Sequence, residues 1–181
     1  MSRFEELTRK VDGFFARVAV RHGTDMQCDT GCSDCCHVRL TITAVEAAAI
    51  RAHVTTWPAE RRRHLGGGQP QTEFCAALDA AGRCKIYEAR PLVCRSHGVP
   101  IRMRRGSLPV VQACHRNFLH TTPDPDCVLD QATLSAMLLA VDAEAAAARG
   151  EAVAEATETG ETGAPGGRIE LARLLADLAT F

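Results

Sequence analysis

Four of the chain's nine cysteines lie within nine residues near its start. Zinc ions and iron–sulfur clusters are held by several thiolates that lie within a few ångströms of one another. Spacings of about two to four residues provide this arrangement, because the chain turns once and presents a second side chain to the same point. Gly31 suits a turn with positive φ and argues against one regular helix with a stripe of small buried cysteines. We therefore predict a metal-binding segment, which reads Cys28-Asp-Thr-Gly-Cys32-Ser-Asp-Cys35-Cys36-His37.

The adjacent pair Cys35 and Cys36 adds a geometric constraint. Neighbouring side chains point about 100° apart on a helix and to opposite faces on a strand. One compact ion would therefore be awkward for both thiols. We expect the pair to serve two metals, or different corners of one cluster.

A second set of cysteines follows further along the chain. None of them has a two-residue spacing, so this set alone would be weak evidence for a metal. Together with the first segment it brings the number of cysteines to eight, which allows two sites of four thiolates each. The predicted metal ligands are Cys28, Cys32, Cys35, Cys36, Cys75, Cys84, Cys94 and Cys114.

Basic residues accompany these cysteines. A site of four thiolates around a dication or a dicationic cluster core has a net charge near −2, roughly −4 for two sites. Nearby cations could offset this charge; equally, they could lie on a solvated surface or pair with Glu73 and Glu88. The basic residues concerned are Arg39, Arg83, Lys85, Arg90 and Arg95.

The elements that must position the cysteines are mainly helical. Residues 3–20 carry apolar side chains at helical spacing and predict an amphipathic helix, weakened by Gly13. Thr43 and Glu46 match a capping box, which predicts a helix as far as Val54. Residues 25–39 are expected to be irregular, and Gly66 to Gly68 should break the chain. Further helical segments are expected at 58–63, 86–90, 126–149 and 168–178, and a short hairpin at 99–111 with its turn at 105–107.

These elements predict a mainly α fold: a small cysteine-rich helical domain, stabilised by metal, with irregular loops. The N-terminal helix occupies residues 1–24 and the cysteine-cluster domain residues 25–120. A C-terminal helix at 121–157 should pack on that domain. Residues 158–167 are rich in glycine and predict a flexible linker before a terminal helix at 168–181.

Composition limits the class of protein. The chain has 181 residues, of which 46% are hydrophobic and 24% charged, as in ordinary soluble proteins of about one domain. An odd number of cysteines and an N-terminus of MSRFEELTRK, without a signal-peptide pattern, argue against a secreted disulfide scaffold. No apolar run approaches the roughly 18 residues of a membrane span. We expect a soluble, cytoplasmic protein without a membrane partner.

Three stretches of the sequence resemble the YkgJ-like cysteine-cluster family, also described as the CxxCxxCC zinc- or iron-chelating domain. The first is residues 28–36, which end in the cysteine pair. The second and most specific runs from Phe74 and Cys75 through Gly82-Arg-Cys-Lys-Ile-Tyr-Glu-Ala-Arg-Pro91 to Cys94 and Arg95. The third is residues 114–118. The resemblance covers about residues 25–120.

The resemblance implies a largely helical metal-binding domain that holds zinc, iron or an iron–sulfur cluster. The family includes relatives of flagellin lysine N-methylases. This chain departs from the family name by placing three residues, rather than two, between Cys28 and Cys32. The change loosens the first loop without removing a ligand.

One further cysteine and several histidines are also candidate ligands. Cys127 lies outside the matched stretches, and we interpret it as a buried or spare thiol. Three histidines lie beside cysteines and could replace a ligand or hydrogen-bond to sulfur, although a non-ligand role is favoured for each. These are His37, His97 and His115, whereas His22, His53, His64 and His120 are expected on the surface.

The leading functional hypothesis is a metal-binding protein that holds zinc or an iron–sulfur cluster, with an unidentified protein partner. An alternative is an iron–sulfur-dependent redox or protein-modifying enzyme. The C-x3-C-x2-C spacing at Cys28, Cys32 and Cys35 occurs in radical S-adenosylmethionine enzymes, but their βα barrel needs a longer chain with alternating strands. There is also no dinucleotide-binding or P-loop motif.

A third hypothesis is a nucleic-acid or protein adaptor, suggested by two basic runs at residues 61–63 and 102–105. Few aromatic residues are present to stack on bases, and the sequence pI is near 6.6. Solvated surfaces are therefore the favoured interpretation of both runs, and nucleic acid is not the expected partner.

Overall fold

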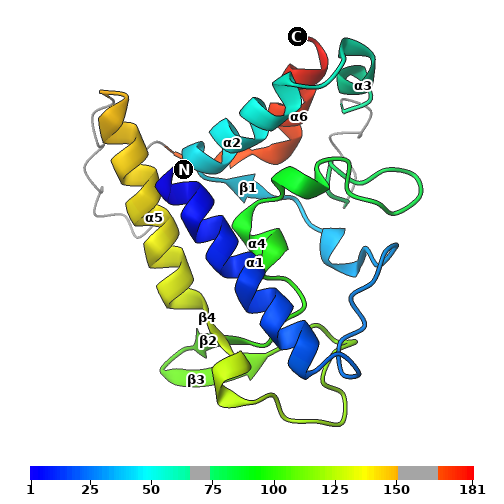
Figure 1. Cartoon of the computed structure of the whole chain (residues 1–181), viewed down its shortest axis with the longest axis vertical. Helices are drawn as coiled ribbons and strands as arrows, with labels where there is room; N and C mark the ends of the chain where they lie inside the picture. The colour runs from blue at the N-terminus through cyan, green and yellow to red at the C-terminus, as the bar shows by residue number, and fades with distance from the viewer. Residues whose placement is uncertain (66–73, 151–166) are drawn as a thin grey trace. The chain divides into compact units, whose positions relative to one another are not determined.

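The computed structural model describes residues 1–65, 74–150 and 167–181 (Figure 1). The described residues are 48% helical and 11% strand, so the mainly α class is confirmed. They form two compact units. Unit 1 contains Met1–Thr30 and Leu92–Leu138, and unit 2 contains Gly31–Pro91 and Leu139–Phe181.

Unit 1 is built on the long helix α1, Arg3–Arg21. Ser2 and Glu5 form a capping box at its start, and the helix continues through Gly13. Its buried face carries apolar side chains at the predicted spacing. The short helix α4, Leu92–Arg95, packs against α1, and the Arg95 guanidinium lies 2.8 Å from the Asp12 carboxylate. The buried residues of α1 are Phe4, Leu7, Val11 and Val18.

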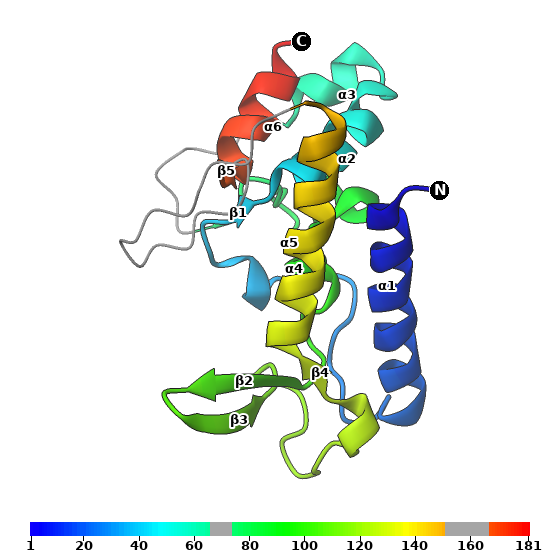
Figure 2. The same ribbon diagram turned by 90° about the vertical axis from the view of Figure 1, so that its left-hand side faces the viewer.

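The predicted hairpin is present in unit 1. Strands β2, Ile101–Arg105, and β3, Leu108–Gln112, pair antiparallel, and Gly106 takes a φ of 63° at the turn (Figure 2). Strand β4, Leu129–Asp130, pairs parallel to β2. A small core of Val18, Val99 and Cys127 lies in this unit.

The helix predicted at 126–149 begins later than expected. Residues Pro125–Cys127 form a 3-10 turn, η3, and α5 runs over Gln131–Ala148. The intervening residues pair with β2, and the Leu129 amide donates to the Pro100 carbonyl at 2.8 Å. The Asp130 carboxylate then accepts from the Thr133 amide at 2.8 Å at the helix start. Tertiary pairing has therefore replaced the first helical turn.

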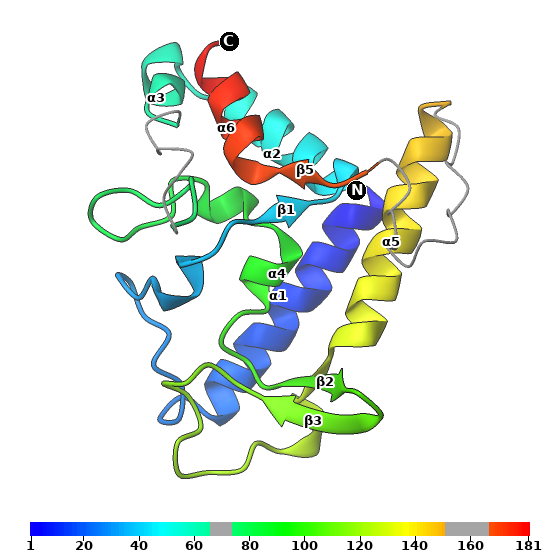
Figure 3. The same ribbon diagram turned by 180° about the vertical axis from the view of Figure 1, so that it is seen from behind.

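Unit 2 packs helices beside one short pair of strands. Strands β1, Thr41–Ile42, and β5, Ile169–Glu170, pair antiparallel (Figure 3). The helices are α2, Ala44–Thr55, with the predicted capping box, then α3, Ala59–Arg63, and α6, Leu171–Ala179. Helix α6 contacts both α2 and α3. The terminal helix begins three residues later than predicted because Ile169 and Glu170 pair with β1 instead.

The core of unit 2 is apolar and continuous. It contains Ile50 and Val54 of α2, Trp57, and the leucines of α6. Ile86 joins it just before the 3-10 turn η2, Tyr87–Ala89, where the sequence predicted a helical turn. Cys75 and Cys84 pack against the edge of this core, which ties the cysteine segment to the helices.

Some predictions lie beyond the part of the chain that the structure describes. The chain break at Gly66 to Gly68 and residues 158–166 of the predicted linker belong to this group. Among the described residues, no helix has the length and apolar character needed to cross a membrane.

Candidate metal centre

Two segments of unit 2 carry the main group of thiols. Cys35 and Cys36 lie in the 3-10 turn η1, Asp34–Cys36, within the stretch predicted to be irregular. Cys75 and Cys84 stand at the two ends of a ten-residue loop. The two segments are joined directly, because the Cys75 amide donates to the Cys36 carbonyl at 2.6 Å.

The loop between Cys75 and Cys84 is closed by its own hydrogen bonds. Leu78 and Cys84 form a β-bridge, and the Asp79 amide donates to the Arg83 carbonyl at 2.8 Å. The Asp79 carboxylate accepts from the amides of Ala81, at 2.9 Å, and Arg83, at 2.8 Å. These bonds lower the pKa of Asp79, the Arg83 amide contributing most. Backbone bonds and the Asp79 carboxylate thus hold the two cysteines in place.

The four thiols of this group influence one another electrostatically. The pKa of Cys36 is raised first by a hydrogen bond with the Cys35 side chain, then by burial, then by the negative charges of its neighbours. Burial is the main cause that raises the pKa of Cys75 and of Cys84, and charge on Cys35 adds to both. The thiol group of unit 2 therefore comprises Cys35, Cys36, Cys75 and Cys84.

The direction of the adjacent pair differs from expectation. The sequence predicted that the side chains of Cys35 and Cys36 would point apart, but they are hydrogen-bonded to each other. Both also interact with Cys75. The tight 3-10 turn makes this possible, because its geometry is not that of a helix or a strand. The contact is compatible with different corners of one cluster, and the choice between one cluster and two metals stays a prediction.

Some of the basic residues beside the cysteines act on the thiol group, and others do not. Lys85 acts to lower the pKa of Cys75, and Arg90 acts to lower that of Cys84. The Lys85 ammonium also donates to the His64 carbonyl at 3.1 Å, and burial lowers its pKa. Arg83 instead pairs with Asp79, at 3.2 Å. Charge compensation thus comes from part of the predicted set.

Unit 1 holds Cys28 in a defined position. The Asn117 side-chain amide donates to the Cys28 sulfur at 3.3 Å and to the Gly98 carbonyl at 2.8 Å. Its oxygen accepts from the Gln27 amide at 2.8 Å, and the residue is only 4% exposed. A Cβ atom at Gly98 would lie well under 3.0 Å from the Cys28 sulfur. N–H donors of this kind orient and tune sulfur ligands.

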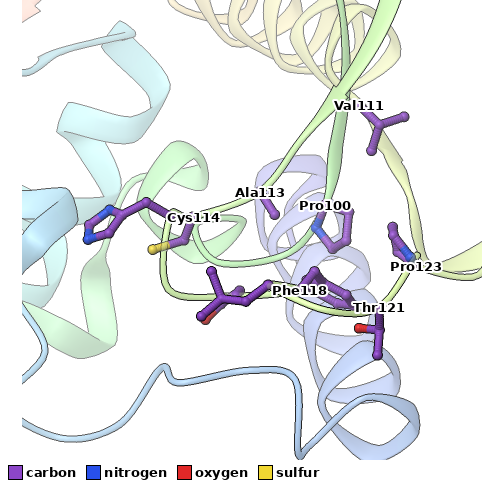
Figure 4. A pocket seen from close by; sticks show the side chains of 10 residues that line it. Pro100, Val111, Ala113, Cys114, Phe118, Thr121 and Pro123 are labelled. Carbon is purple, nitrogen blue, oxygen red and sulfur yellow. The ribbon is translucent and has the colours of Figure 1, made fainter.

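The other predicted ligands lie in different surroundings. Cys94 is on α4, and Cys32 is half-buried in the turn after Gly31, whose φ is 94°. Cys114 borders a pocket of about 300 Å³ in unit 1. Figure 4 shows the Cys114 side chain at one end of the pocket and Pro123 at the other.

Cys127 is fully buried among Val18 and Val99, as the interpretation of a buried thiol requires. The ring of His37 packs edge-on against Phe74, with centroids 4.5 Å apart. The expectation that His22 lies on the surface is wrong, since its side chain is only 11% exposed. Asp25 is a local partner, but Asp124 and Phe118, which also contact the ring, lie about a hundred residues away in the sequence, so a local pattern could not have shown these contacts.

The fold and the thiols define a small, mainly α, cysteine-rich protein. Residues 27–115 match the CxxCxxCC family model, described as a "putative zinc- or iron-chelating domain". The match spans all eight predicted ligands and excludes Cys127. No curated protein and no solved structure matches the chain.

Proposed function

We propose that this chain is a metal-binding protein that holds zinc or an iron–sulfur cluster through cysteine thiolates. The thiol group of unit 2 is the first site. One observation carries this proposal: two separate cysteine segments are joined by the 2.6 Å hydrogen bond from the Cys75 amide to the Cys36 carbonyl. The four thiols of these segments are close enough that charge on one raises the pKa of others.

The physical argument starts from the cost of ionising these thiols together. Each thiolate that forms raises the free energy of forming the next, and burial adds to that cost. A dication or a cationic cluster core among the sulfurs reverses the sign of the effect, because it stabilises every thiolate at once. Binding of the metal therefore releases protons and couples to folding of the cysteine segments. The donor set of sulfur suits zinc or iron–sulfur chemistry.

The remaining predicted ligands belong to the same proposal. Asn117 donates a hydrogen bond to the sulfur of Cys28, which is the contact that an orienting residue makes to a thiolate ligand. The family model also spans this part of the chain. The further proposed ligands are Cys28, Cys32, Cys94 and Cys114. We also propose that the bound metal stabilises the fold.

The identity of the metal is tested by composition and colour. Protein purified without oxygen is assayed for iron, acid-labile sulfide and zinc, and its visible spectrum is recorded. Iron with sulfide and a brown colour identify a cluster, whereas stoichiometric zinc in a colourless sample identifies a zinc protein. Full-length folded protein without either metal would refute the proposal.

The site is tested with the double variant Cys35→Ser and Cys36→Ser. We expect it to lose bound metal and to unfold at a clearly lower temperature than the wild type. Ser33→Ala is the matched control, because Ser33 precedes the same 3-10 turn and its side chain makes no capping hydrogen bond. Equal metal content and equal melting temperatures in the double variant and the control would contradict the assignment.

A second candidate function is an iron–sulfur-dependent redox or protein-modifying enzyme. The pocket of about 300 Å³ beside Cys114 favours it, since this volume reaches the lower end of small-molecule sites. The lining combines apolar side chains with polar groups from His115, Asn117 and Thr121. Binding of S-adenosylmethionine, measured by calorimetry on the metal-loaded protein, would support this candidate. If S-adenosylmethionine does not bind, the pocket no longer supports a methylase-like activity.

A further inference from the structure

A second group of metal-binding side chains lies in unit 1, away from the predicted cysteine ligands. His22 follows α1. Asp124 precedes the turn η3 and Cys127 is its last residue, and this turn contacts α1 (Figure 2). Each of the three residues offers one ligand atom, and these atoms all lie within 4.8 Å of one another. All three residues fall outside the family match at 27–115. We propose that His22, Asp124 and Cys127 form a separate site for a zinc ion.

The spacing of the three atoms suits a common centre. Zinc ligands lie about 2.0–2.3 Å from the ion, and atoms 4.8 Å apart reach that distance from one point after shifts of about 0.5–0.8 Å each. His22 Nε2 lies 3.5 Å from Asp124 Oδ2, so this pair is already close to the separation in a tetrahedral site. Small side-chain rotations complete the arrangement.

The hydrogen bonds of His22 match those of a metal-binding imidazole. Its Nε2 accepts the backbone amide of Asp124 at 3.4 Å and therefore carries a lone pair on the side that faces the other ligands. Its Nδ1 lies 3.4 Å from the Asp25 carboxylate. A carboxylate on the far nitrogen fixes the orientation of the ring, as in carboxylate–histidine–zinc arrangements. The ion takes the place of the long amide contact at Nε2.

The second ligand is oriented as well. Arg21 Nε lies 2.5 Å from Asp124 Oδ2, and its Nη1 lies 2.9 Å from Asp126 Oδ2. The charges of Asp124 and then Asp126 raise the pKa of Arg21. Asp25, Asp124 and Asp126 outweigh the single charge of Arg21. A dication is therefore attracted here, and Asp124 can bind it while retaining Arg21.

The third ligand determines which metal is favoured. Cys127 is fully buried in the small apolar core of unit 1, whereas the Asp124 side chain is 40% exposed. One imidazole, one carboxylate and one thiolate suit zinc, whereas magnesium and calcium prefer oxygen ligands alone. Three protein ligands leave a fourth position for water. On binding, the Cys127 thiol loses its proton to solvent and forms a sulfur–zinc bond.

The test is zinc titration of the full chain against a chromophoric chelator. We expect the wild type to bind one more zinc ion per chain than the His22→Gln variant. In the Asp124→Asn variant the affinity for this additional ion should fall at least tenfold. Asp25→Asn removes only the partner of Nδ1 and should weaken it by about 10–100-fold. Asp126→Asn is the matched control for Asp124→Asn, because both carboxylates pair with Arg21. His120→Gln, at an exposed histidine, is the control for His22→Gln.

The outcomes separate this site from the cysteine sites. The double variant Cys35→Ser and Cys36→Ser should keep the zinc ion at His22, and His22→Gln should keep the metal of the thiol group. Equal zinc content and affinity in the wild type and Asp124→Asn would overturn the proposal. An equal loss of zinc affinity in Asp124→Asn and Asp126→Asn would also overturn it, because zinc would then be attracted by the general negative charge of the region. If His22→Gln fails to fold, cobalt replaces zinc in the wild type and in Asp124→Asn, and the two visible spectra are compared. The cobalt ion that the variant loses must account for a thiolate-to-cobalt band in the wild-type spectrum. If the difference between the spectra lacks this band, ligation by Cys127 is refuted.

Discussion

Gly98 provides a direct test of how Cys28 is held. The residue has a φ of 99°, which disfavours any side chain. A Cβ added there would lie under 3.0 Å from the Cys28 sulfur, 3.4 Å from the Asn117 amide nitrogen and 3.7 Å from the Phe15 ring. Gly98→Ala therefore changes the backbone energy and displaces the sulfur at the same time.

Both effects can be given a magnitude. Placing alanine at positive φ costs about 1–2 kcal/mol. Forcing a methyl group into occupied space costs a further 1–3 kcal/mol, roughly, because Asn117 is buried and the Cys28 loop must shift. The sum, about 2–5 kcal/mol, is a large part of the roughly 5–15 kcal/mol that stabilises a domain.

Gly106→Ala is the control that separates the two effects. Gly106 also has positive φ, 63°, but no atom lies within 4 Å of an added Cβ. It should cost only the backbone share, about 1–2 kcal/mol. We expect urea unfolding to show a larger loss for Gly98→Ala, and chelator competition to show faster metal loss for this variant alone.

Equal effects of the two glycine variants would refute this reasoning. If both unfold at the same urea concentration and retain metal equally, the Cys28 sulfur does not occupy the space beside Gly98. A large loss of stability in Gly98→Ala with unchanged metal binding would instead support the packing of the Cys28 sulfur against Gly98. It would also mean that Cys28 is not a metal ligand.

Two further predictions concern the thiolates. Asn117→Asp replaces the N–H donor 3.3 Å from the Cys28 sulfur with a carboxylate, so we expect metal affinity in a chelator competition assay to fall about 10–100-fold; an unchanged affinity would mean that the contact does not act on a ligand. The pKa values of Cys36, Cys75 and Cys84 are raised, so these thiols are protonated near neutral pH and must lose protons when metal binds. Metal affinity measured from pH 6 to pH 8 should therefore rise steeply, by up to about tenfold per pH unit for each thiol that ionises, and a flat profile would contradict ligation by protonated thiols.

The parts of the fold that the sequence predicts well are those with local signals. The capping boxes at Ser2 and Thr43 fix the starts of α1 and α2, because both partners lie within four residues. The hairpin at β2 and β3 is equally local, with Gly106 at its turn. The predicted cysteine ligands follow from spacing in the same way, and their roles stay predictions.

The differences arise where distant segments pair. Leu129 joins β2 through the carbonyl of Pro100, and Ile169 joins β1, so neither residue continues the helix that its own sequence favours. His22 is buried by contacts with Asp124 and Phe118, about a hundred residues away. The direction of Cys35 and Cys36 depends on the 3-10 turn. For Leu129, Ile169 and His22 a long-range contact decides between locally acceptable alternatives, whereas the cysteine pair follows a local turn that its sequence does not specify.

The self-closed loop between Cys75 and Cys84 has a consequence for the order in which ligands engage. Its backbone hydrogen bonds already offset the entropy cost of closing ten residues into a loop. This cost grows with loop length. For an ion held by Cys75, the Cys84 sulfur is therefore present at a high effective concentration, and the chelate forms with little further ordering.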